Sequence, residues 1–285
     1  MHIEEHFIDV LGLRTRYLTA GSGPAVILLH AVGESAADWQ WVLPVLARTH
    51  RVYALDLFSH DNSSHPDTDY SAEFFAHFVA TFMTKLNIDR AAVVGNSLGG
   101  FIALHLALME PSRVTALGLV DSVGLGREIH PALIMIISPV LGDIGATWNK
   151  TLLGSRLRAW WRAPLIFANP WRIPKEWYRE QYRLAQLPNF INTELKAARS
   201  QVDFRGQRTV LLDQLPRLEM PTLIIWGEND AIFPIAHARS ALGRLPNGKL
   251  ELIPQCGHLP PVEQPERCAA VLRKFLVKTH LIKPT

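Results

Sequence analysis

Five short segments of the chain are apolar at nearly every position, and stretches with helical periodicity separate them. An unbroken apolar run of this length is typical of a strand whose two faces are both covered. Strands that alternate with helices form a mainly parallel sheet with helices on both faces, so we expect an α/β fold. The five predicted strands are residues 25–29, 52–55, 91–94, 114–120 and 222–226.

The chain around these segments carries clear local signals. Residues 3–20 predict two short strands joined by a tight turn, and residues 249–253 predict a further strand. Ser71 predicts an N-cap, and the last helix is expected to begin at Pro265. After Ser71 the apolar positions repeat at the spacing of one helix face. They are Phe74, Phe75, Phe78, Val79, Phe82 and Leu86.

The regular alternation of strands and helices stops between residues 123 and 213. This stretch is rich in Trp, Arg and Pro, and it separates two good series of strands and helices. We interpret residues 123–213 as an inserted helical cap or lid. Residues 1–122 and 214–285 then form a single α/β core, with no second independent domain.

The predicted cap has an unusual composition. Between Trp148 and Arg183 it holds eight basic residues, two acidic residues and five of the eight tryptophans of the chain. Basic side chains among amphipathic aromatic ones suit transient contact with an anionic membrane surface, or an apolar substrate that carries a carboxylate. The alternative is an ordinary cap whose tryptophans pack on the core and whose arginines are solvated.

The overall composition excludes several classes of protein. Of the 285 residues, 48% are hydrophobic and 19% are charged, which is not the composition of a disordered or fibrous chain. The net charge of +3 is too small to indicate a nucleic-acid partner. The oligomeric state leaves no signal in the sequence.

The cysteines and the apolar runs bear on compartment and cofactors. Two cysteines without a Cys-x-x-Cys pair predict neither a disulfide framework nor a metal or redox centre. The first residues are acidic where a secretory signal is basic, and the most apolar run, 132–141, is too short for a membrane span. We therefore expect a cytoplasmic protein.

Ser97 lies between a predicted strand and a predicted helix, in the sequence Gly95-Asn96-Ser97-Leu98-Gly99. Glycines two residues before and two residues after a serine permit a very sharp turn that holds the serine at the tip of the strand. The N-terminus of the following helix favours negative charge beside it. Ser97 is therefore the candidate nucleophile.

A serine hydroxyl needs a base that takes its proton. His258 is the candidate base among the twelve histidines, because it follows the predicted strand 249–253 and precedes the last helix. A residue at that point faces the crevice at the carboxyl ends of the strands, where open α/β sheets bind ligands.

The base in turn needs a carboxylate that fixes its tautomer. Asp230 follows the predicted strand 222–226 and is the favoured acid. Asp121, after strand 114–120, is the alternative acid, and Glu228 is a weaker third candidate. With Asp230, the order along the chain is nucleophile, acid, base, which is the order of one fold class.

These segments together resemble the α/β-hydrolase superfamily. The resemblance covers almost the whole chain outside the predicted cap, through the turn at Ser97, Gly-x-x-Asp-x-x-x-Pro around Asp230 and Gly-His-x-Pro around His258. A fourth element, His30-Ala31-Val32-Gly33, stands where the family has His-Gly-x-x.

The resemblance implies an oxyanion hole made by backbone N–H groups. Its donors are expected to be Val32 and Leu98, with Ala31 as the substitute for Val32, because Ala31 replaces the family's glycine. His30 is expected to be the family's structural histidine, packed behind this loop.

A second departure from the family lies at residues 56–64, where relatives commonly carry a glycine-rich loop. This segment contains no glycine, although its asparagine and aspartates can supply the turn geometry. His60 and Asp61 belong to it and are expected to be loop residues, with a place in the pocket wall as the alternative.

The resemblance implies acyl transfer to water without a metal or an organic cofactor. The favoured function is a serine hydrolase of the carboxylesterase or lipase-like class (EC 3.1.1), acting on a small apolar ester through an acyl-enzyme. The alternatives are a carbon–carbon bond hydrolase of the meta-cleavage type and a non-catalytic receptor on the same fold. Leu259 weighs against the meta-cleavage type, whose members usually have tryptophan directly after the catalytic histidine.

Overall fold

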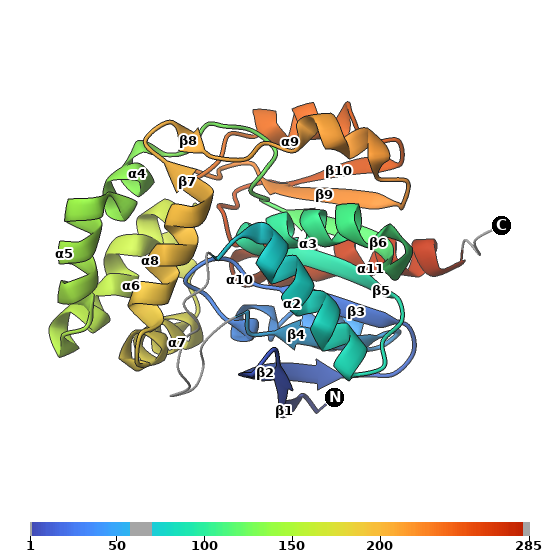
Figure 1. Ribbon diagram of the computed structural model, residues 1–285, viewed down its shortest axis with the longest axis horizontal. Coiled ribbons are helices and arrows are strands. Elements are labelled where there is room, and N and C mark those ends of the chain that lie inside the picture. The colour runs from blue at the N-terminus through green and yellow to red at the C-terminus, as the bar shows by residue number, and fades with distance from the viewer. Residues whose placement is uncertain (1, 58–69, 282–285) are drawn as a thin grey trace.

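Eight strands form the central sheet of the protein (Figure 1). The computed structural model describes residues 2–57 and 70–281. The strands lie in the order β1-β2-β4-β3-β5-β6-β9-β10. The neighbouring pairs from β4 to β10 are parallel, whereas the pairs β1–β2 and β2–β4 are antiparallel. Their bounds are β1 Glu4–Val10, β2 Leu13–Ala20, β3 Ala25–Leu29, β4 Arg51–Leu55, β5 Ala91–Asn96, β6 Val114–Val120, β9 Thr222–Gly227 and β10 Gly248–Ile253. The predicted α/β fold with a mainly parallel sheet is confirmed.

Helices cover both faces of this sheet, as expected for strands that are apolar at every position. Alternate residues of one strand enter different cores: Ile27 and Leu29 belong to one apolar cluster, Val26 and Leu28 to the other. On the first face lie α2 Ala72–Lys85, α3 Leu98–Met109 and α9 Ala236–Leu242. On the second lie the 3-10 turn η1 Ala36–Trp39 and the helices α1 Leu43–Leu46 and α11 Pro265–Leu281.

The predicted start of α2 is confirmed. The Ser71 hydroxyl accepts a hydrogen bond from the Phe74 N–H at 3.2 Å, which satisfies one of the free amides of the first helical turn. The apolar stripe of α2 packs on the sheet, with Phe75, Phe78 and Phe82 fully buried. His60 and Asp61, which were expected to be loop residues, lie outside the described residues.

Five helices fill most of the interval between β6 and β9. Figure 1 shows them grouped together beside one end of the sheet. We call residues 131–201 the α4–α8 segment; a short hairpin of β7 and β8 follows it, with α10 Pro260–Glu263 farther along the chain. The bounds are α4 Pro131–Ile137, α5 Pro139–Asn149, α6 Leu152–Ile166, α7 Lys175–Gln186, α8 Phe190–Gln201, β7 Val202–Asp203 and β8 Gly206–Gln207.

Helices α4 and α5 are rich in apolar residues. Among the described residues, no single helix has the length and apolar composition to cross a membrane. α4 and α5 meet those two criteria when taken together, and they are bent by 74° at the break between them.

Candidate active site

Ser97 lies on the sharp turn between β5 and α3 that its sequence predicts. Its backbone is strained, with φ 53° and ψ −113°, values that an L-residue rarely adopts. A Cβ atom at Gly95 would overlap the backbone of Gly99, and one at Gly99 would overlap the carbonyl of Leu29. The two glycines therefore allow the strand and the helix to approach closely enough to form the turn.

His258 and Asp230 meet beside this turn. The Nδ1 atom of His258 lies 2.9 Å from Oδ2 of Asp230, and both side chains are buried. The other carboxylate oxygen of Asp230 accepts the Ile232 N–H at 2.7 Å, which fixes the carboxylate plane. With Nδ1–H donating to Asp230, the Nε2 atom of His258 is left to accept a proton, as a general base requires.

The two other candidate acids do not contact the histidine. Asp121, at the end of β6, accepts the Gly227 N–H at 2.9 Å and so supports the start of the loop that carries Asp230. Burial, followed by the charge of Asp230, raises the pKa of Asp121 well above its usual range. Glu228 is exposed to solvent. The structure thus brings Asp230, the favoured acid, to His258.

Asp121, Asp230 and His258 also form a compact group of possible metal ligands. One ligating atom from each lies within 4.8 Å of the others. His258 Nδ1 and the Asp230 carboxylate lie 2.9 Å apart, which is the distance of a direct hydrogen bond. This hydrogen bond is sufficient to explain why the two side chains lie so close together.

Backbone N–H groups are available where an oxyanion hole is expected. Leu98 is the first residue of α3, so the helix has no internal acceptor for its N–H. No hydrogen bond of the described residues takes up the N–H of Val32. Ala31, Val32 and Leu98 line the same cavity as Ser97. His30 is buried behind this loop, where its Nε2 accepts the Leu57 N–H at 2.9 Å.

Two residues that the sequence analysis missed hold the histidine loop. The amide of Asn96 donates to the carbonyls of Val120 (3.0 Å) and His258 (3.1 Å), and so joins β5, β6 and the loop. The carboxylate of Glu263 accepts the N–H groups of Gly257 (2.6 Å) and Asn169 (2.8 Å). Asn96 directly precedes Ser97 in the chain, which is a local signal; Glu263 gives no signal of its contacts in the sequence.

A buried polar network ties the α4–α8 segment to the loop after β3. Glu34, next to Gly33 on that loop, accepts hydrogen bonds from Trp177 Nε1 at 3.0 Å and from Gln181 Nε2 at 2.6 Å. Arg162 forms an ion pair with Glu34 at 3.1 Å. Burial raises the pKa of Glu34, against the opposing effect of the arginines.

Gln181 is the centre of this network. Its Oε1 atom accepts hydrogen bonds from Arg158 and Arg162, each at 2.5 Å, and its Nε2 also donates to the Gly33 carbonyl at 3.3 Å. Arg158 forms a second ion pair, with Glu194 at 2.5 Å. The network holds the chain directly after Val32, the candidate oxyanion donor.

Replacing Gln181 with leucine is expected to destabilise the protein by about 2–3 kcal/mol, because two guanidinium groups and Glu34 lose a buried partner. Urea unfolding measures this loss. Gln186→Leu is the matched control, since Gln186 lies on the same helix but is exposed to solvent. Equal losses for the two variants would show that the network adds nothing to stability.

A cavity of about 420 Å³ opens beside Ser97 and His258. Its charged lining residues, Glu34, Arg158, Arg162 and Glu194, are paired with one another. The rest of its wall is mainly apolar and comes largely from the α4–α8 segment. The apolar wall includes Leu133, Ile136, Ile137, Leu165, Ile166, Ile191, Leu195, Phe233 and Leu259.

The chain belongs to the alpha/beta hydrolase family. The model of that family matches residues 26–271, which include all the candidate site residues. The order of the sheet and the turn at Ser97 agree with this match. The protein is thus a hydrolase of the alpha/beta family.

Three similar proteins are informative. An uncharacterized protein of Mycobacterium tuberculosis is 30% identical over a match that covers 96% of this chain and 81% of that protein. The 2-hydroxy-6-oxo-6-(2'-aminophenyl)hexa-2,4-dienoic acid hydrolase of Metapseudomonas resinovorans is 29% identical over a match that covers 95% of this chain and 90% of the hydrolase. Among solved structures, a membrane phospholipase A, described as a bacterial virulence factor, has 25% sequence identity to this chain and a TM-score of 0.79. The match covers 98% of this chain and 87% of the phospholipase chain.

Proposed function

We propose that the protein hydrolyses carboxylic esters of apolar acyl or aryl groups, with Ser97 as nucleophile, His258 as base and Asp230 as the acid that orients the base. The contact that supports this proposal most directly is the hydrogen bond of His258 to Asp230 beside the turn of Ser97. The α4–α8 segment serves as the cap that supplies most of the substrate pocket.

The proposed reaction proceeds in two halves. The Ser97 hydroxyl attacks the ester carbonyl carbon while His258 takes its proton, and the N–H groups of Val32 and Leu98 bind the oxyanion. The tetrahedral intermediate expels the alcohol, which receives the proton from His258. Water, deprotonated by His258, then attacks the acyl-enzyme. The second tetrahedral intermediate breaks its bond to Ser97 Oγ, which receives the proton from His258, and the carboxylic acid is released.

The charges of the pocket favour a neutral substrate. Both arginines that line it, Arg158 and Arg162, are paired with glutamates, so neither is free to bind a substrate carboxylate. The predicted advantage for an apolar substrate that carries a carboxylate therefore gains no support from this wall. An apolar acyl or aryl group, by contrast, fits a wall of aliphatic side chains.

The chain length of the acyl group is expected to control the rate. For p-nitrophenyl esters, kcat/KM should rise by about threefold to fourfold per methylene group, since each buried methylene contributes about 0.8 kcal/mol, until the acyl chain fills the cavity. A series of esters from acetate upwards measures this. A flat or falling series would contradict a pocket that binds the acyl chain.

A carbon–carbon bond hydrolase is the second candidate, favoured by the similarity to the dienoic acid hydrolase of Metapseudomonas resinovorans. A dienoate substrate carries a carboxylate, for which the described pocket residues offer no unpaired cation. We therefore expect a 2-hydroxy-6-oxo-6-aryl-dienoate to be turned over more slowly than the best ester at equal concentration. The reverse order of kcat/KM would replace the ester proposal with this one.

A further inference from the structure

Helices α5 and α6 are built the opposite way from ordinary surface helices. They bury small and polar residues: Ser155 is fully buried and Arg158 is 1% exposed, with Gly142, Ala146 and Gly154 also facing inward. Surface helices normally turn their large apolar residues toward the core and their polar residues toward water. The inversion leaves most of the large apolar side chains of both helices exposed, although Ile166 at the end of α6 is buried.

These outward side chains lie on helices that pack on one another, and together with the exposed Met135 of α4 and Trp171 beyond α6 we call them the apolar face. Of the sixteen exposed large hydrophobic residues among those that the structure describes, eleven lie between residues 135 and 171. Large contiguous apolar patches are rare on monomeric proteins and mark sites of interaction. The face consists of Met135, Val140, Leu141, Ile144, Trp148, Leu152, Leu153, Leu157, Trp160, Trp161 and Trp171.

The exposed charges among the residues of the apolar face are mainly basic. Lys150, Arg156 and Arg172 are exposed among its residues. The single acidic residue from 131 to 173 is Asp143, and it forms an ion pair with Arg199 at 2.8 Å. Apolar residues with exposed tryptophans and a basic surround are complementary to a membrane that contains anionic lipid.

The apolar face continues into the pocket of Ser97. Leu141, Trp148 and Trp161 are exposed on the face and also line the 420 Å³ cavity. An acyl chain in contact with the face therefore reaches the cavity along apolar side chains without crossing bulk water.

We propose that the apolar face docks on an anionic lipid surface. Its tryptophan, leucine and isoleucine side chains enter the boundary between headgroups and acyl chains, and the three exposed cations contact the headgroups. The docking does not depend on which bond the enzyme cleaves, so it stands apart from the proposed function.

Vesicle binding tests this proposal. The protein and its Ser97→Ala variant, which cannot alter the lipid by turnover through Ser97, are sedimented with vesicles of phosphatidylcholine alone or mixed with phosphatidylglycerol. We expect binding to the mixed vesicles, and weaker binding when the salt rises from about 0.1 M to about 1 M, because the Debye length falls from about 10 Å to about 3 Å.

Two triple variants separate the apolar and the charged contributions. Val140→Ser, Ile144→Ser and Leu152→Ser together should lower the partition coefficient about tenfold or more, since each side chain is at least 63% exposed and its removal opens no cavity. Replacing Lys150, Arg156 and Arg172 with glutamine should also lower it about tenfold or more, and should remove most of the salt dependence.

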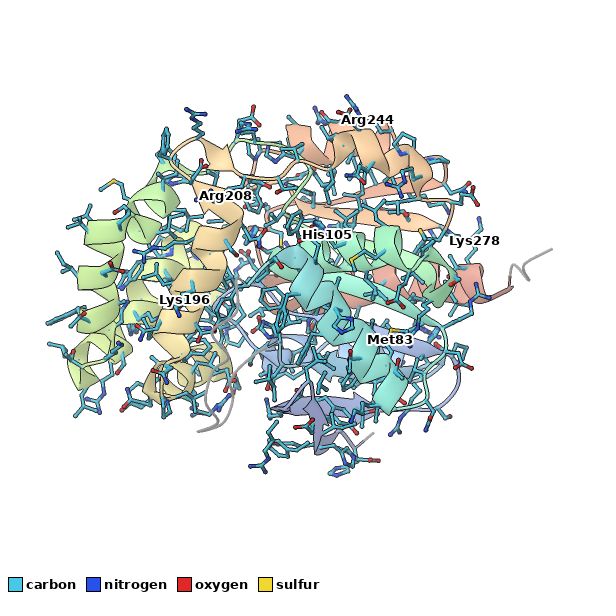
Figure 2. The ribbon with its side chains drawn as sticks, in the orientation of Figure 1. Met83, His105, Lys196, Arg208, Arg244 and Lys278 are labelled. Atoms are coloured by element: carbon cyan, nitrogen blue, oxygen red, sulfur yellow. The ribbon has the colours of Figure 1, made fainter. Side chains whose placement is uncertain are left out.

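Matched controls lie away from the apolar face. Arg273, Lys274 and Lys278 are exposed on α11, and Figure 2 shows Lys278 at the opposite end of the molecule from α5. Their replacement by glutamine should leave binding close to that of the unmodified protein. The apolar control replaces Phe7, Leu11 and Met109, all exposed, with serine.

Three results would overturn the proposal. They are absence of binding to the mixed vesicles, equal losses in the face variants and their controls, and a dimer in sedimentation velocity that the apolar triple variant abolishes. The last result would show that a second copy of the chain covers the face. Vesicle sedimentation and sedimentation velocity do not depend on ester hydrolysis. If the protein did not hydrolyse esters, both measurements would still test the docking proposal.

Discussion

Replacing Ser97 with alanine is expected to lower kcat by about 10⁴-fold or more while the protein stays folded. The turn keeps its shape because Gly95 and Gly99, and not the hydroxyl, permit the close approach of β5 and α3. The hydroxyl is the atom that the proposed acyl-enzyme requires. The measurement is kcat for the best p-nitrophenyl ester, with circular dichroism as the test of folding.

Ser122→Ala is the matched control for this substitution. Ser122 is also a buried serine at a strand end, and its hydroxyl donates to the Val123 carbonyl at 2.8 Å. Its loss should cost about 1 kcal/mol of stability and leave kcat nearly unchanged. Labelling by a fluorophosphonate should fail in the Ser97 variant alone. Absence of labelling in the unmodified protein would favour the non-catalytic receptor.

The core of the fold could be predicted because its strands are buried on both faces. Each of β3, β4, β5, β6 and β9 is apolar at nearly every position, and a parallel sheet with helices on both faces buries such strands. The N-cap at Ser71 could be predicted because it depends only on neighbouring residues: the Ser71 hydroxyl accepts the N–H of the residue three positions later.

The sequence analysis predicted a helical cap over residues 123–213 but did not place its individual helices, and the reason is physical. The prediction of an amphipathic helix assumes that its apolar side faces the protein. In α6 the buried positions include Ser155 and Arg158, and the exposed positions include Leu153 and Trp160. Arg158 is stable inside because Gln181 and Glu194 are its partners, and both lie in later helices.

The candidate site was predictable as far as it depends on local sequence. Ser97 needs only its neighbouring glycines and the strand-turn-helix context. The contacts of Glu34 and Gln181 join residues far apart in the chain, and single positions in the sequence carry no sign of them. The choice between Asp121 and Asp230 was open for a similar reason, because both follow parallel strands that end at the same edge of the sheet.

Replacing Asp230 with asparagine is expected to lower kcat by about 10⁴-fold. An asparagine can still accept the Ile232 N–H, so the loop keeps its shape. Its amide cannot accept the proton of His258 Nδ1 as the carboxylate does. The imidazole then loses both the fixed tautomer and the negative charge that stabilises its protonated form.

Asp121→Asn is the control that separates the two candidate acids. Asp121 contacts the Gly227 N–H and not the histidine, and the carbonyl of an asparagine can keep that contact. Burial already raises the pKa of Asp121 well above its usual range, so a neutral side chain is the lesser change there. We therefore expect kcat of Asp121→Asn to stay far closer to that of the unmodified enzyme. If Asp121→Asn lost more activity than Asp230→Asn, the acid would follow β6 and the proposed role of Asp230 would be wrong.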